Sequence, residues 1–221
     1  PAAAMAFQAS LAADPDREDA RWALFEIEQL RGNGVAARAH QAHVLARRRL
    51  FSRVAPREER RVIALLAPGD LKANAPLEFV FDGERTTLHR YYVTPQADAL
   101  ELPAADVVFI AIGESPEAVP VLRRAARIVR ALGLPVINAP RFVPRTNRAK
   151  LSRIVRGISH CSMPQVLQRT RASLASQGPP FDYPLVVRPI GSQAGERIAR
   201  VASREQLDTY LETAPDDAFF V

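Results

Sequence analysis

The sequence predicts an α/β fold with a helical N-terminal part, a small parallel-sheet domain and a final α+β part that is incomplete. Three observations support this fold class. Apolar residues recur at helical spacing near the start, two long apolar runs then suit buried parallel strands, and short strands and helices alternate near the end. We therefore expect three regions, at 1–53, 54–144 and 145–221.

The N-terminal region is predicted to be helical throughout, with turns at 14–16 and 32–34. Between the turns an apolar face recurs at helical spacing: Ala20, Leu24, Ile27 and Leu30. Ala3, Phe7 and Pro15 have the spacing of the alanine, aromatic and closing proline of tetratricopeptide repeats, so this region resembles that repeat. A plain helical hairpin is the alternative. Repeats of this kind imply a protein partner that docks on the helices.

The middle region contains two apolar runs typical of buried parallel strands. These are "RVIALLAP", from Arg61, and "DVVFIAIG", which ends at Gly113. An amphipathic helix follows the second run, and Gly133 is expected to end it before the short strand "PVIN". Strand, helix and strand of this length predict a right-handed parallel crossover. "PLEFVF" and "HRYYV" are further candidate strands.

The last region has shorter elements. "NRAKLSRIVRGI" is amphipathic, and "SMPQVLQ" and "RIARVAS" are candidate strands. Ser203 and Gln206 have the spacing of a capping box, which predicts a helix start. "AFFV" begins another strand in which the sequence stops, so we interpret Val221 as a truncation point.

The composition is that of an ordinary globular chain, with 48% hydrophobic and 24% charged residues. With the single cysteine Cys161 the chain cannot form a disulfide framework, which favours a cytoplasmic location. No apolar run reaches the length that spans a membrane, so no membrane partner is expected. His40 and His43 lack an evident third ligand, and we predict no metal site in these residues.

The net charge of +6 raises the question of an anionic partner. Lys72 and Lys150 are the only lysines, and the abundance of arginine, alanine and proline together is typical of a GC-rich genome. The Arg-rich joint "RRRLFSRVAPREERR" is the candidate for nucleic acid, but few aromatic residues accompany it for base stacking. We therefore interpret the charge mainly as composition bias and the joint as a solvated linker, with an anionic partner as small as a nucleotide as the alternative.

The stretch "YPLVVRPIGSQAGE" takes an apolar strand directly into a loop of small residues, with Arg188 at the entrance. One interpretation is a hairpin whose glycines supply positive φ. The other is an anion site, in which backbone N–H groups of the loop and the fixed charge of Arg188 bind phosphate. A simple hairpin needs only a short loop and no cation before a proline, so both interpretations stay open at this point.

Taken with "VINAPRFVPRTNRAKLSRIVRGISHCSMPQVLQ" before it, this stretch resembles the ATP-grasp superfamily. More narrowly, it is similar to the ligases related to ribosomal-protein glutamate ligase and glutathione synthetase. In that family a small α/β domain ends in an N-x-P turn, a basic helix start carries a lysine, and a strand of the type F/Y-P-L-V-V-K-P precedes a glycine-rich loop over the nucleotide phosphates. The resemblance covers roughly 54–221.

The resemblance implies that the ATP phosphates bind to the helix start and to the glycine-rich loop. Lys150 stands at the place of the family's first phosphate-binding lysine, and Arg188 at the place of the second. Arginine keeps the charge at this second place but is not interchangeable with an ammonium. The matching loop residues are Gly191, Ser192, Gln193 and Gly195. We expect the cations to converge on one cleft, while Glu196 puts an anion beside the loop.

The implied chemistry is an ATP-dependent ligation of a carboxylate and an amine through an acyl phosphate, with Mg²⁺ bridging the phosphates. The family's metal ligands and catalytic arginine are expected beyond residue 221, so this part alone is expected to be inactive and no catalytic residue is assigned. The sequence does not name the acid or the amine. A non-catalytic scaffold that binds a nucleotide or a protein, with a degenerate site, is the alternative.

Overall fold

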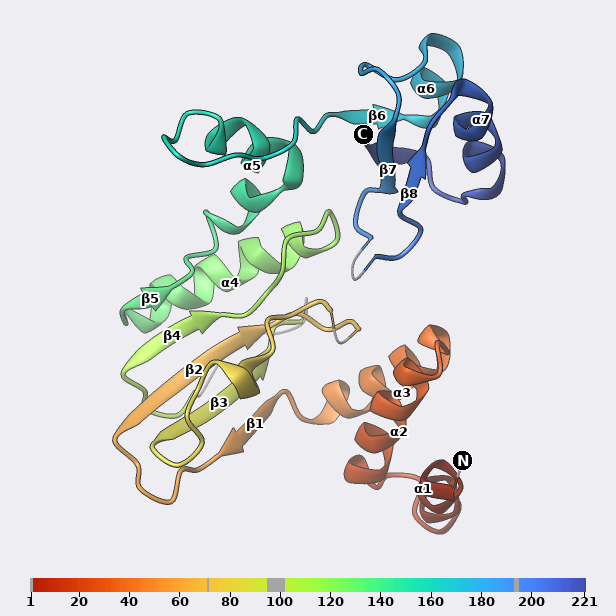
Figure 1. Ribbon diagram of the computed structural model, residues 1–221. Coiled ribbons are helices and arrows are strands. Elements are labelled where there is room, and N and C mark those ends of the chain that lie inside the picture. Colours follow the sequence, from red (N-terminus) through yellow and green to blue (C-terminus); the bar gives the residue numbers. More distant parts are fainter. Residues whose placement is uncertain (1, 71, 95–101, 193–194) are drawn as a thin grey trace. The chain divides into compact units, whose positions relative to one another are not determined.

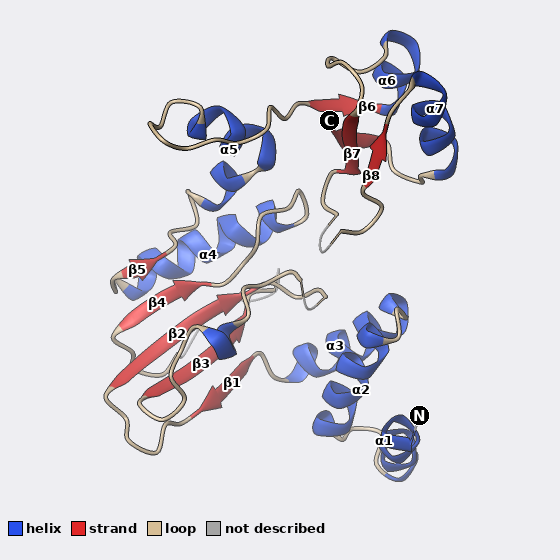
Figure 2. Ribbon diagram, in the orientation of Figure 1, coloured by secondary structure: helices blue, strands red, loops and turns tan. Residues whose placement is uncertain are grey.

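The computed structural model describes residues 2–70, 72–94, 102–192 and 195–221 (Figure 1). The chain divides into two compact units. The first contains Pro1–Gly113 and Glu117–Val143, and the second contains Glu114–Pro116 and Pro144–Val221. The predicted α/β class is confirmed, with helices and strands in both units (Figure 2). The three-region division stays a prediction.

Three helices open the first unit, α1 (Ala2–Ala13), α2 (Glu18–Leu30) and α3 (Gly34–Arg47). Gly32 makes the turn between the last two with φ of 80°, a conformation that favours glycine. The predicted apolar face is correct for Ala20 and Leu24, which are buried, but wrong for Leu30, which is 80% exposed at the end of α2. The prediction of helix as far as residue 53 is wrong at its end, because Leu50–Arg53 form a strand.

The first sheet has the strand order β1-β3-β2-β4-β5. Its strands are β1 (Leu50–Arg53), β2 (Arg60–Leu66), β3 (Thr86–Tyr92), β4 (Val107–Ile110) and β5 (Val136–Ile137). All neighbouring pairs are parallel except β1 with β3. The antiparallel partner explains the missed strand: β1 is short and half-buried, and only its pairing with β3 reveals it. The parallel β4–α4–β5 crossover is confirmed.

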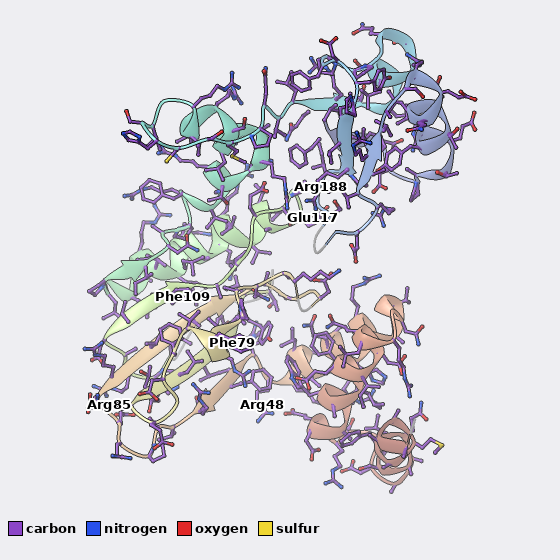
Figure 3. The ribbon with its side chains drawn as sticks, viewed as in Figure 1. Arg48, Phe79, Arg85, Phe109, Glu117 and Arg188 are labelled. Carbon is purple, nitrogen blue, oxygen red and sulfur yellow. The ribbon has the colours of Figure 1, made fainter. Side chains whose placement is uncertain are left out.

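The two faces of this sheet are covered differently. Helix α4 (Ala118–Leu132) packs its apolar side on one face and ends at Gly133, whose φ of 65° matches the predicted helix end. On the other face, Trp22 and Leu45 from the helices join the long connection after β2. That connection contains the 3₁₀ turn η1 (Leu77–Phe79) where a strand was a candidate. Its Phe79 is 90% exposed (Figure 3).

The second unit is an antiparallel sheet with helices beside it, in the strand order β6-β9-β7-β8. Its elements, after the 3₁₀ turn η2 (Val143–Thr146), are α5 (Arg148–Val155), β6 (Gln168–Thr170), α6 (Arg171–Gln177), β7 (Leu185–Pro189), β8 (Ala199–Val201), α7 (Arg204–Thr213) and β9 (Ala218–Phe220). The predicted strand "SMPQVLQ" is wrong over most of its length, since β6 begins only at Gln168.

The core of the second unit lies between the sheet and helices α6 and α7. Phe219 is fully buried there, together with Leu174, Val187 and Leu207. The predicted N-cap is confirmed, since the Ser203 hydroxyl accepts from the N–H of Gln206 at 3.3 Å. The return bond differs from that of a capping box, because the Gln206 side chain accepts from the N–H of Ala202 and not from that of Ser203. None of the helices in the described ranges has both the length and the apolar character needed to cross a membrane.

Candidate functional site

Strand β7 leads into the predicted loop, and its side chains alternate between the core and the surface. Leu185 and Val187 are buried, whereas Val186 is 48% exposed. This alternation is that of a strand with one covered face. Arg188 is the last side chain but one of the strand, half-buried at its loop end.

The loop joins β7 to β8 in an antiparallel hairpin, with Val187 opposite Ala199 in the register. Gly191 and Gly195 have φ of 83° and 79°. Arg197 also has positive φ, at 49°. The hairpin interpretation is thus correct for the topology, but the loop from 190 to 198 is longer than a tight turn requires. Gln193, a predicted site residue, lies outside the described residues.

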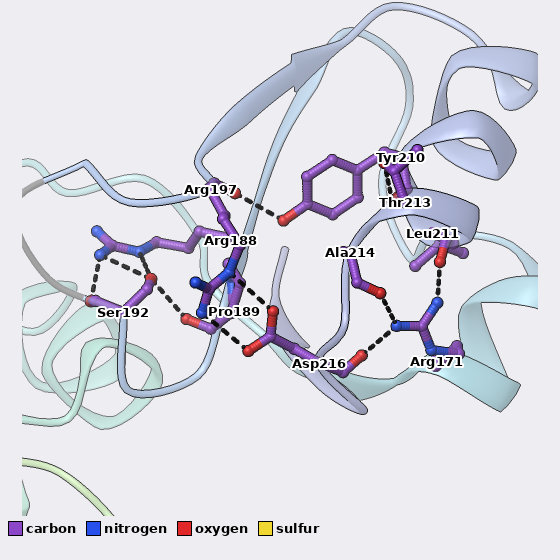
Figure 4. A network of polar contacts seen from close by, with 10 residues as sticks. All are labelled: Arg171, Arg188, Pro189, Ser192, Arg197, Tyr210, Leu211, Thr213, Ala214 and Asp216. Carbon is purple, nitrogen blue, oxygen red and sulfur yellow. Dashed lines mark hydrogen bonds and ion pairs between the residues drawn. The ribbon is translucent and has the colours of Figure 1, made fainter. Parts of the chain in front are cut away.

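Arg188 and Ser192 are the two predicted residues that the structure brings together (Figure 4). The Arg188 Nε donates to the Ser192 hydroxyl at 3.2 Å, and a terminal guanidinium nitrogen donates to the same hydroxyl at 3.0 Å and to the Ser192 carbonyl. The hydroxyl in turn donates to the Pro189 carbonyl at 2.8 Å. Ser192 is only 4% exposed. The hydroxyl proton of Ser192 is thus donated within the loop, and the contacts of Arg188 with Ser192 hold the loop against the end of the strand.

A second arginine acts on Arg188 electrostatically. Burial lowers the pKa of Arg188 from its ordinary value, and the positive charge of Arg148 lowers it further. The Arg148 guanidinium carbon lies 6.0 Å from the centre of the Phe220 ring, and Phe220 is the cross-strand neighbour of Arg188. Neither arginine forms an ion pair with a carboxylate in the described part of the chain. Two like charges near one strand end favour an anion between them.

The position of Arg148 follows from the way helix α5 begins. Asn147 is its N-cap, with a side chain that accepts from the N–H of Ala149 at 3.2 Å. The same side chain donates to Glu114 at 3.3 Å and accepts from Gln168 at 3.4 Å. Asn147 therefore fixes the first turn of α5, and with it Arg148, to two other segments of the second unit.

Lys150 does not join Arg188. It is exposed, and its ammonium donates to the Pro144 carbonyl at 3.2 Å, on the segment just before the helix. Among the described residues no hydrogen bond or ion pair links Lys150 to the loop. The expected convergence of Lys150 with Arg188 is therefore not seen among the described contacts. The cation that acts on Arg188 is Arg148, two residues before Lys150.

The far end of the loop is anchored by residues that sequence reasoning missed. Arg197 donates to Asp216 at 2.9 and 3.1 Å, and its carbonyl accepts from the Tyr210 hydroxyl at 2.7 Å. Burial and the nearby Asp216 carboxylate raise the pKa of Tyr210. The Asp216 carbonyl accepts from Arg171, which also donates to two carbonyls at the end of α7 (Figure 4). No local sequence signal identifies Asp216 as a partner of the loop, because Arg197 is 19 residues away in the sequence.

In the described ranges, no group of three or more histidine, cysteine, aspartate or glutamate side chains is arranged to hold a metal ion. The second unit has a single cysteine, Cys161, which is exposed. The described site contains two arginines, a hydroxyl and a loop with glycines in positive φ, which are groups that can bind an anion.

No protein family matches the sequence, and no curated protein matches it. Several solved structures are similar in part. VanG, a D-Ala:D-Ser ligase from Enterococcus faecalis, is 13% identical with a TM-score of 0.47, over 73% of this chain and 61% of that ligase. The D-alanine–D-alanine ligase from Bacillus anthracis, complexed with ATP, is 14% identical with a TM-score of 0.43, over 73% and 55%.

A third similar structure is a RimK domain ATP-grasp protein from Sphaerobacter thermophilus, at 16% identity and a TM-score of 0.41, over 72% of this chain and 62% of that one. The chain thus spans 55–62% of the length of these three proteins.

Proposed function

We propose that this chain is part of an ATP-dependent ligase that joins a carboxylate to an amine through an acyl phosphate. In this proposal the second unit binds the ATP phosphates at the loop after β7, with Arg188 and Arg148 as the cations. The observation that carries it is a pair of arginines on either side of Phe220: Arg188 is its cross-strand neighbour, and Arg148 lies 6.0 Å from its ring centre. Neither forms an ion pair with a carboxylate in the described part of the chain.

Arg188 is suited to exchange its present partner for a phosphate. Its guanidinium holds one residue, Ser192, through contacts to a hydroxyl and a carbonyl. A phosphate offers the same fork two charged oxygens, and hydrogen bonds between ionised groups are roughly twice as strong as neutral ones. Binding would then release Ser192 and allow the glycines of the loop to turn their N–H groups toward the phosphates.

The two arginines have distinct parts in this proposal. Arg188 orients a phosphate through its planar fork, which a lysine cannot do. Arg148 contributes charge that offsets the negative charge of the triphosphate. Lys150 stays a third candidate, since a change of rotamer suffices to break its single hydrogen bond to Pro144. Bound ATP would supply the phosphoryl group that activates the carboxylate.

Binding of magnesium and of the two substrates is proposed for the whole protein and not for this chain alone. The described residues include no cluster of metal ligands, so we derive no step through the metal. The residues of this chain bind and orient phosphate, and no group among them is assigned to the transfer itself.

One observation favours a non-catalytic scaffold as the second candidate. Arg188 is satisfied within its own loop, and the Ser192 hydroxyl donates to Pro189. A site that had lost nucleotide binding would keep such contacts to fix the hairpin. In that case the helices of the first unit are the surface for a protein partner.

Titration of the chain with ATP, followed by thermal unfolding, separates these candidates. A ligand that binds the folded state alone raises the melting temperature with its concentration. We expect such a rise with ATP, and Arg188→Ala is expected to weaken the affinity at least about tenfold, since a hydrogen bond to a charged group contributes about 1.5–3 kcal/mol. Arg148→Ala is expected to weaken it about threefold to tenfold.

Arg127→Ala is the matched control, because Arg127 is an exposed arginine on α4 in the first unit. It removes the same charge and is expected to leave the affinity unchanged. Lys150→Ala tests the third cation in the same titration. Absence of any rise with ATP, with or without Mg²⁺, contradicts the nucleotide site and leaves the scaffold.

A further inference from the structure

The first unit has a pocket of about 250 Å³ that the nucleotide proposal does not use. It lies at the carboxyl ends of β2 and β3, where Leu66 and Tyr92 end these strands, and helices α2 and α3 supply its other side. In sheets with parallel strands, ligands bind outside the carboxyl ends of the strands. The residues that carry the argument are Trp22, Phe25, Glu26, Gln41, Asp70 and Asn74.

The loop after β2 is held in place by two side-chain amides. Gln41, only 4% exposed, accepts from the N–H of Gly69 at 2.8 Å and donates to its carbonyl at 3.0 Å. Asn74 does the same to Ala67, at 2.7 and 2.9 Å. Each side-chain amide thus pairs with both the N–H and the carbonyl of one loop residue, as the backbone of a neighbouring strand would. The loop that carries Asp70 to the rim of the pocket is therefore preorganised.

An aromatic cluster forms one wall. The centre of the Trp22 ring lies 5.1 Å from that of Phe25, 5.5 Å from that of Tyr92 and 4.9 Å from that of Phe51, which does not line the pocket. These tilted arrangements are favourable for aromatic pairs and hold Trp22 in one orientation. Trp22 is half-buried, so part of its surface stays available at the pocket.

Two carboxylates stand beside this wall. Glu26 on α2 and Asp70 on the loop both line the pocket and are exposed. Asp70 accepts from the N–H of Lys72 at 2.8 Å through one oxygen, which fixes its carboxylate in the loop. Arg90 lines the pocket as well, so the lining contains two acids and one base. Aromatic rings attract organic cations, and carboxylates in the same lining attract them by charge.

We propose that this pocket binds a small organic ammonium ion, with its apolar body against Trp22 and Phe25 and its ammonium group between Glu26 and Asp70. The proposal is independent of the nucleotide site, since every lining residue belongs to the first unit. The volume restricts the ligand to a molecule of about the size of an amino acid or a simple amine.

Trp22 provides a direct test, because it is the only tryptophan in the chain. The probes are phenethylammonium, 2-phenylethanol and phenylacetate, which have similar shapes and positive, zero and negative charge. We expect phenethylammonium at millimolar concentration to change the fluorescence of Trp22 saturably, and phenylacetate to leave it unchanged. The affinity for the alcohol is expected to be about fivefold lower than for the ammonium ion.

Glu26→Gln and Asp70→Asn are each expected to weaken phenethylammonium binding about twofold, less than the loss for the alcohol, because each variant keeps the other carboxylate. Both substitutions keep the side-chain shape, and Asp70→Asn keeps an oxygen for the N–H of Lys72. Glu212→Gln, which removes an exposed carboxylate from α7 in the second unit, is the control. Circular dichroism melting checks that each variant is folded.

Three results would overturn the proposal. The first is unchanged Trp22 fluorescence with all three probes, which identifies the pocket as a packing gap between helices and sheet. The second is phenylacetate binding as tightly as phenethylammonium, which assigns the site to anions. The third is wild-type affinity in the folded Glu26→Gln variant.

Discussion

The loops after β2 and after β7 both follow a strand from a core into the surface, but they are held by different chemical groups. The first is fixed by neutral amides that pair with backbone, Gln41 with Gly69 and Asn74 with Ala67. The second is held by the guanidinium of Arg188 on Ser192. A neutral amide has no reason to leave a backbone partner for an anion, whereas a guanidinium gains by exchanging a hydroxyl for a phosphate. The first loop is thus held by contacts that an anion does not displace, whereas the proposed phosphate site requires the second loop to open. We call the contact of Arg188 with Ser192 the latch.

The largest expected effect is on the amide-fixed loop. Asn74→Ala is expected to lower the free energy of unfolding of the first unit by about 2–3 kcal/mol, because it leaves the N–H and carbonyl of Ala67 without partners. Urea unfolding followed by Trp22 fluorescence measures this unit. A loss below about 0.5 kcal/mol would mean that water replaces the amide and that the loop is not fixed by it.

The contact of Arg188 with Ser192 in the second unit is expected to contribute less to the free energy of unfolding than the Asn74 amide does in the first. Ser192→Ala is expected to lower the stability of the second unit by about 1 kcal/mol, because Arg188 keeps the Ser192 backbone carbonyl as an acceptor. Hydrogen exchange of the β7 and β8 amides measures it. In the ATP titration this variant is expected to bind as well as or better than the wild type, since Arg188 is freer. A loss of ATP affinity would instead indicate that the Ser192 hydroxyl contacts phosphate.

Gly133 and Gly195 both have open space around them, so alanine at each position tests how firmly the local backbone conformation is held. Gly133 ends α4 and Gly195 lies in the second loop, with φ of 65° and 79°. Alanine at Gly133 is expected to cost about 1 kcal/mol, because the helix end fixes the left-handed conformation. Gly195→Ala is expected to cost less, since a latch loop can change its φ. Thermal unfolding of both variants measures the two losses of stability. Equal losses would mean that the second loop is as firmly fixed as the end of α4.

The smallest expected effect concerns pH in the first unit. Burial lowers the pKa of His89 and of His40, against the smaller opposing effects of Glu58 and Glu28. A histidine with a lowered folded-state pKa binds fewer protons in the folded state than in the unfolded one. Its contribution to stability is therefore complete above about pH 6.5 and is lost as the pH falls below that value.

Urea unfolding followed by Trp22 fluorescence at pH 7.5 and pH 5.5 checks this prediction. We expect the first unit to be slightly less stable at the lower pH and His89→Gln to reduce the difference. His89 accepts or donates one hydrogen bond at 2.8 Å with Ser52, which glutamine can replace. A stability that rises toward pH 5.5 would contradict the sign.

Local patterns in the sequence were sufficient for much of the fold. The apolar runs predicted β2 and β4, and the apolar periodicity with its final glycine predicted α4. The spacing of Ser203 and Gln206 predicted the start of α7. In each case the signal and the structure lie within a few residues of each other, and the burial or the hydrogen bond needs no distant partner to be recognised.

The candidate site was only partly accessible from the sequence. The loop and Arg188 were visible, because a cation between an apolar strand and a glycine loop is a local pattern. The role of Arg148 was not, because it depends on Asn147 tying α5 to Gln168 and on Phe220 lying opposite Arg188.

The sequence by itself determined the α/β class, the longest strands and helices and the presence of a loop with a cation at its entrance. Only the tertiary structure decided that 50–53 form a strand, that Arg148 rather than Lys150 acts on Arg188, and that a pocket lies between the helices and the first sheet. The physical reason is the same in all three cases. Strand pairing, charge proximity and cavities depend on residues that meet only when distant segments pack together.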